Sequence, residues 1–163
     1  MRTPPPPRPS AHGASPAGRL RLFAAWLFLF GAAGTLGELA LLEHTESLVQ
    51  WLPLIVVAAG SGAVVWALAR PGVVPLRLVQ ITGALIAVVG ALGVWYHYRG
   101  NAAFELEMAP DSGGWPLVWN SLTGATPSLA PGLMIQLGLL GVAFTYRHPA
   151  LAGAYRTDTG EAT

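Results

Sequence analysis

Four long apolar runs constrain the fold of this chain more than any other feature. They cover residues 20–42, 48–69, 76–98 and 129–146. A helix rises about 1.5 Å per residue, so roughly 20 residues cross the ~30 Å hydrocarbon core of a bilayer. The first three runs reach that length and the fourth is slightly short. The pattern predicts an all-α integral membrane protein whose four transmembrane helices form a compact bundle.

The composition supports a membrane protein and excludes several other classes. Only 10% of the 163 residues are charged, whereas a soluble domain carries about 25%. The net charge of +1 gives no basic surface for nucleic acid, so the expected partner is the lipid bilayer. The absence of cysteine excludes disulfides, thiolate catalysis, iron–sulfur clusters and cysteine-ligated zinc.

The arginines predict how the four runs are oriented. Eight of nine lie before or just inside the start of the first run, between the second run and the start of the third, or after the fourth; only Arg99 lies on the other side. Positive residues favour the cytosolic side, so both termini are expected in the cytosol of a bacterial cell, with the chain in its inner membrane. Residues 1–19 then form a disordered, Pro-rich cytosolic tail, and residues 148–163 form a second, short one. As an alternative, the first run is a cleaved signal peptide, which leaves the other three spans unchanged.

Small residues within the runs predict where the helices touch. Helices in lipid associate through residues that let their backbones approach closely, because the hydrophobic effect does not drive them together there. The candidates are Gly31, Gly34 and Gly37 in the first run, Ala58 and Gly62 in the second, Gly83, Ala87 and Ala91 in the third, and Gly138 and Gly141 in the fourth.

The loop of residues 99–128 is too long for a simple connector. Within it, Trp115, Val118, Trp119 and Leu122 recur at helical spacing, Pro116 suits the first turn of a helix, and Gly124 suits its end. This predicts a short amphipathic helix that lies on the outer leaflet or caps the bundle; a lid over a pocket is the alternative. Tryptophan and tyrosine favour the membrane interface, and the expected anchors are Trp95, Tyr96, Tyr98, Trp115 and Trp119. Ser128 is a candidate N-cap for the fourth span.

Glu38 is the most informative polar residue, because it lies inside the first apolar run. An ionisable group at such a depth is costly and usually faces other helices or water. It is therefore interpreted as a proton carrier, a ligand or the partner of a cation. The alternative is a neutral carboxylic acid that hydrogen-bonds to a neighbouring helix.

Further polar groups are expected at the same outward end. If the third span continues as a helix, His97, Asn101 and Glu105 share one face. Imidazole and carboxylate together suit zinc, iron or manganese, although the spacing matches no metal motif. The alternatives are hydrogen-bonded interfacial histidines and haem held between the two histidines. The cofactor stays unknown, with a metal ion as one candidate, and the candidate metal residues are His97, His44, Glu38, Glu43, Glu105 and Glu107.

Three functions are compatible with these features. The first is an accessory or interaction subunit of a membrane complex, with another membrane protein or a second copy as partner. The second is handling of a metal, a proton or a small ligand at the outward Glu/His cluster. The third is a membrane enzyme acting on a lipid or a quinone. No nucleophile motif or phosphate-binding glycine loop is present, and the sequence leaves open whether the protein is an enzyme.

Overall fold

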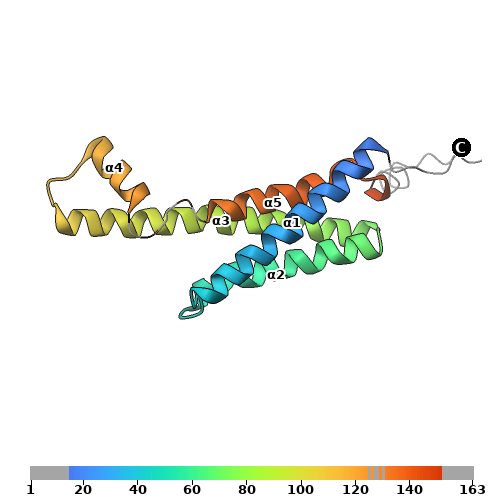
Figure 1. Ribbon diagram of the computed structural model, residues 1–163, viewed down its shortest axis with the longest axis horizontal. Helices are drawn as coiled ribbons and strands as arrows, with labels where there is room; N and C mark the ends of the chain where they lie inside the picture. The colour runs from blue at the N-terminus through green and yellow to red at the C-terminus, as the bar shows by residue number, and fades with distance from the viewer. Residues whose placement is uncertain (1–14, 125, 127–128, 130, 152–163) are drawn as a thin grey trace, which may run out of the picture.

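The computed structural model describes residues 15–124, 126, 129 and 131–151, and all regular structure in these ranges is helical. The helices are α1 (Pro16–Leu41), α2 (Leu48–Ala69), α3 (Val73–Met108), α4 (Gly114–Thr123) and α5 (Gly132–Thr145) (Figure 1). Helices α1, α2 and α3 are long and apolar enough to cross a membrane. Helix α5 has 14 residues, or about 21 Å, so the predicted fourth span is not confirmed. Both predicted tails lie largely outside the described residues, as does Ser128.

Local capping explains where the first two helices begin. α1 starts at Pro16, four residues before the predicted span, because Ser15 Oγ accepts a hydrogen bond from the Gly18 N–H at 3.1 Å and proline suits the first turn. α2 has the predicted bounds. Its capping box pairs the Ser47 N–H with Gln50 Oε1 at 2.9 Å and the Gln50 N–H with Ser47 Oγ at 3.4 Å.

Helix α3 begins three residues before the predicted third span and ends ten residues after it. Its 36 residues measure about 54 Å. Alanine, glutamate, leucine and methionine dominate the added segment, and these residues favour helix even where the apolar run has ended. α4 turns back and packs on this segment, so residues 99–124, the α3–α4 hairpin, project beyond the other helices (Figure 1).

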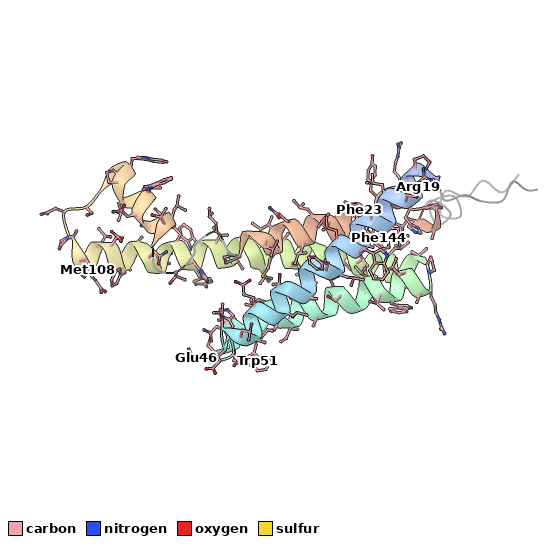
Figure 2. All side chains as sticks on the ribbon, in the orientation of Figure 1. Arg19, Phe23, Glu46, Trp51, Met108 and Phe144 are labelled. Carbon is pink, nitrogen blue, oxygen red and sulfur yellow. The ribbon has the colours of Figure 1, made fainter. Side chains whose placement is uncertain are left out.

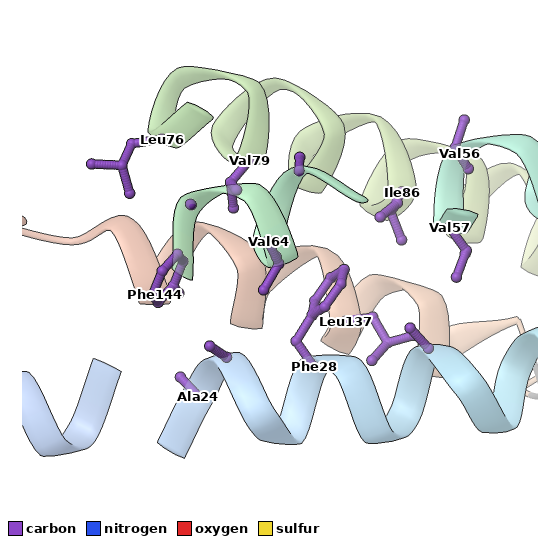
Figure 3. Close-up of a cluster of buried hydrophobic side chains, with 14 of the residues drawn as sticks. Ala24, Phe28, Val56, Val57, Val64, Leu76, Val79, Ile86, Leu137 and Phe144 are labelled. Atoms are coloured by element: carbon purple, nitrogen blue, oxygen red, sulfur yellow. The ribbon is translucent and has the colours of Figure 1, made fainter. Parts of the chain in front are cut away.

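The core lies where α1, α2, α3 and α5 meet. Phe28, Val57, Ile86 and Leu137, one from each helix, are at most 1% exposed. Figure 3 shows these side chains converging from the four helices. α5 is antiparallel to α3 and makes its most extensive contacts with it.

Two glycines allow the close approach of α3 and α5. A Cβ at Gly83 would lie 2.9 Å from the Gly138 carbonyl oxygen, and a Cβ at Gly138 would overlap the Gly83 carbonyl oxygen. The predicted glycine contact is therefore confirmed for these helices. In the first two spans the prediction was partly wrong, because Gly34, Gly37 and Gly62 have no atom within 4 Å of an added Cβ.

The contact glycine of α2 is Gly60, two residues from the predicted Gly62. A Cβ at Gly60 would lie 2.6 Å from Ile86 Cδ1 and 3.3 Å from Phe28 Cζ. Two residues correspond to about 200° around a helix, so Gly62 faces away from the core that Gly60 contacts.

Polar contacts join the helix ends at which α1 and α3 begin and α5 finishes, here named the arginine end. Gln80 Nε2 donates to Thr145 Oγ1 at 3.1 Å, a hydrogen bond between α3 and α5. Arg77 Nη1 donates to Gln80 Oε1 at 2.8 Å, and Arg21 Nη1 donates to the Arg147 carbonyl at 3.3 Å. These contacts fix the end of α5 against α1 and α3.

Candidate functional site

A cavity of about 120 Å³ lies at the opposite ends of the helices, here named the acidic end because Glu38, Glu43 and Glu46 lie there. Figure 2 shows the side chains at the α1–α2 turn, with Glu46 and Trp51 labelled. The lining comes from α1, α2, α3, the α1–α2 turn and the start of α5, and is mostly apolar. Its polar members are Thr35, Glu38, His44 and His97.

One face of α1 supplies two of these groups. Thr35, Glu38 and Leu42 stand at i, i+3 and i+7 and all border the cavity. Glu38 is exposed at the rim, whereas Thr35 is 6% exposed. The carboxylate therefore stands at the mouth and the hydroxyl lies deeper.

The turn after α1 brings His44 to the same cavity. The Glu43 N–H donates to the Ala40 carbonyl at 3.2 Å and the His44 N–H donates to the Leu39 carbonyl at 3.0 Å. Glu43 has a φ of 50°, so this is a Schellman motif with a non-glycine residue in the left-handed position. The turn folds His44 back over the end of α1, while Glu43 is exposed outside the cavity.

Helix α3 places His97 opposite α1. Val89, Gly93 and His97 stand at i, i+4 and i+8 and line the cavity together. A Cβ at Gly93 would lie 2.8 Å from Pro131 Cβ, so the glycine lets the start of α5 close one side. His97 therefore borders the same cavity as Glu38 and His44.

The Thr35 hydroxyl is an exception among the serine and threonine hydroxyls of the described helices. The others donate to a carbonyl three or four residues earlier, at 2.7–3.0 Å for their shortest bonds: Ser61, Thr82, Ser121, Thr123 and Thr145. Thr35 Oγ1 is buried and has no hydrogen-bond partner in the described part of the chain. A buried hydroxyl without a partner costs about 1–3 kcal/mol, and sequence reasoning missed it because threonine is common in such helices.

A second hollow continues from the cavity. It is a groove of about 570 Å³ between α1 and α5, and it shares Thr35, Glu38 and Leu133 with the cavity. Its other lining residues are apolar except Gln136.

The remaining carboxylates of the predicted cluster lie elsewhere. Glu105 Oε2 accepts a hydrogen bond from Asn120 Nδ2 at 3.3 Å, and Glu107 is exposed on the projecting part of α3. Asn101, on the same face as Glu105, donates to the carbonyls of Ser121 and Thr126 at 2.9 and 2.6 Å. Within the described ranges, no three His, Asp or Glu side chains gather closely enough to hold a metal ion.

Four of the predicted aromatic anchors form two pairs at or near the α3–α4 hairpin. Trp95 and Tyr98 stack with ring centroids 6.4 Å apart, and the Arg99 guanidinium lies 5.9 Å from the Trp95 ring centroid. Trp115 and Trp119 lie 6.4 Å apart on α4 and are both exposed. The predicted short helix is therefore present, but it packs on the end of α3 rather than across the other helices.

Comparison of the chain with protein-family models, with curated proteins and with solved structures finds no match. The class of protein is therefore described by its three apolar helices of membrane-spanning length.

Proposed function

We propose that this chain is a multi-pass protein of the bacterial inner membrane that binds a small ligand at its acidic end. The main support is that Glu38, His44 and His97 border one cavity. The Thr35 hydroxyl, which is buried and has no hydrogen-bond partner in the described residues, lies beside them. A concave, mostly apolar site with a few convergent polar groups is the usual form of a small-molecule site. Ligand binding accounts for the Thr35 hydroxyl, whereas a purely structural role leaves it uncompensated.

The proposed topology has α5 as a short fourth span and both termini in the cytosol. Its support is the arginine distribution and the packing of α5 along α3, from Gly90 at one end to Gln80 at the other. A short span is accommodated by tilting of its neighbours or local thinning of the bilayer. The acidic end and the α3–α4 hairpin then face outward.

Single-cysteine labelling tests this topology directly, because the chain has no cysteine of its own. In intact cells, a membrane-impermeant maleimide is expected to label Asp111→Cys and to leave Ser15→Cys and Pro149→Cys unlabelled. Labelling of Pro149→Cys but not Ser15→Cys would show that α5 does not cross the membrane. All three variants are expected to react once the membrane is permeabilised, which controls for reactivity.

Purification from the native membrane in mild detergent tests the ligand. We expect mass spectrometry of an organic extract to find a small molecule bound to the wild type and lost from His97→Ala. His148→Ala, at the arginine end, is the matched control and is expected to retain it. An empty wild-type protein with no bound metal or pigment would refute ligand binding.

A second candidate function, an accessory or interaction subunit of a membrane complex, is favoured by the α3–α4 hairpin. The hairpin exposes Phe104, Met108, Trp115 and Trp119, beyond the helices that form the core. Exposed aromatic residues on a rigid element suit contact with another membrane protein or a second copy. Crosslinking in native membranes, read as loss of a partner in a Trp115→Ala/Trp119→Ala variant, tests this candidate.

A further inference from the structure

We propose that the cavity and the groove together bind an isoprenoid quinone or its quinol, with the ring in the cavity and the chain in the groove. This inference rests on the proposed function, because it names the ligand of the same site. It concerns binding alone and assigns no redox step.

The charges around the site favour a neutral head. No arginine lines the cavity or the groove, and the chain contains no lysine. Phosphate binding in proteins relies on cationic side chains or clustered N–H donors, and here a phosphate would meet the Glu38 carboxylate instead. Anionic phospholipid heads are therefore disfavoured.

The polar groups around the cavity favour a ring with oxygen atoms on opposite edges. A dry cavity of about 150 Å³ in another protein accommodates benzene. The cavity here measures about 120 Å³ and adjoins the groove of about 570 Å³, so a substituted ring in the cavity extends toward the groove. The Thr35 hydroxyl and the imidazoles of His44 and His97 come from different sides, and each can donate or accept a hydrogen bond. A ring bearing carbonyl or hydroxyl oxygens matches donors and acceptors placed in this way.

The groove supplies the place for a hydrocarbon chain. It begins at the residues it shares with the cavity, Thr35, Glu38 and Leu133, and continues past Phe30 and Leu140. A head group alone would leave this apolar hollow unexplained. A molecule with a ring and an isoprenoid chain fills both hollows as one ligand.

The first test is a titration of the purified protein in lipid nanodiscs with decylubiquinone, read by tryptophan fluorescence. Thr35→Val is expected to weaken binding about tenfold, because it removes a hydrogen bond without changing the shape of the side chain. Thr82→Val is the matched control and should bind as the wild type does. The Thr82 hydroxyl already donates to the Leu78 carbonyl at 2.8 Å and borders neither hollow.

The groove has its own pair of variants. Gly34 borders the groove and Gly62 does not, and neither has an atom within 4 Å of an added Cβ. Gly34→Leu is expected to abolish decylubiquinone binding by filling the groove. Gly62→Leu is expected to bind normally, and equal affinities for the two variants would overturn the placement of the chain.

Stability measurements separate binding from folding. Without ligand, Thr35→Val should unfold at the same or a higher temperature than the wild type, because a buried hydroxyl without a partner is removed. A second outcome is a wild type that does not bind decylubiquinone but still carries another molecule that is lost from His97→Ala. That result would refute the quinone assignment but support the ligand site. Failure of both experiments overturns the site itself.

Discussion

Replacing Gly138 by alanine is the sharpest test of how α5 is held against α3. The added Cβ would meet the Gly83 carbonyl oxygen, and it would lie 2.8 Å from both Ala87 Cβ and Ala87 N. Two of these three neighbours are backbone atoms of a helix, so they cannot move aside by a change of rotamer. The helices must separate to admit one methyl group.

The expected magnitude follows from a comparison with Gly62→Ala. Both substitutions gain about 1 kcal/mol in helix propensity, so that term cancels between them. Overpacking of a tight contact costs about 1–3 kcal/mol, and only Gly138 incurs it because Gly62 faces open space. Gly138→Ala is therefore expected to be less stable than Gly62→Ala by about 1–3 kcal/mol.

Thermal unfolding of the detergent-solubilised variants measures this difference. For a protein of this size, 1 kcal/mol corresponds to about 2–4 °C in Tm. Gly138→Ala should melt below Gly62→Ala by at least the lower of these values. Equal melting temperatures for the two variants would refute the close α3–α5 crossing.

Three further changes have defined outcomes. Asn101→Ala should increase hydrogen exchange across α4, because it removes the hydrogen bonds to the Ser121 and Thr126 carbonyls. Asn120→Ala removes only an exposed hydrogen bond and should have little effect, so equal exchange in the two variants would contradict this. Burial, and to a lesser extent the Arg21 guanidinium, lowers the pKa of His148. The unfolded chain therefore binds a proton more readily, so the stability that neutral His148 contributes above pH ~6.5 is lost as the pH falls through its lowered pKa. Tm should accordingly drop between pH 8 and pH 5 in the wild type more than in His148→Gln, and parallel profiles would contradict this. Glu43→Gly should raise Tm, because glycine adopts the left-handed φ without the ~1 kcal/mol cost that other residues bear; a lower Tm would show that the glutamate side chain stabilises the turn.

Hydropathy predicts the helices of this chain better than it predicts their lengths. The bounds of α2 follow from its apolar run and its capping box. The end of α3 does not, because the apolar run marks where a membrane would end, whereas helix propensity continues from Arg99 to Met108. Hydropathy and helix propensity therefore predict the same helix up to residue 98, and only helix propensity predicts its continuation.

The candidate site could also be predicted only in part from the sequence. Glu38, His44 and His97 could be brought together from the sequence because each lies at the same end of its apolar run. Glu105 could not be excluded, because its separation from the cavity depends on α3 continuing straight and on Asn120 packing beside it. The groove could not be predicted either, because it depends on the angle at which α1 crosses α5, and no pattern within a single helix contains that angle.

The unbroken course of α3 has a mechanical consequence. The helix is held against α5 from Gly83 to Gly93, because an added Cβ at either glycine would lie within 3 Å of an α5 or Pro131 atom. Beyond Gly93 the rest of α3 continues as one helix to Met108, about 22 Å further on. His97 lies one helical turn past this anchored segment, between the cavity and the α3–α4 hairpin. A partner that tilts the hairpin would therefore move the His97 wall of the cavity first.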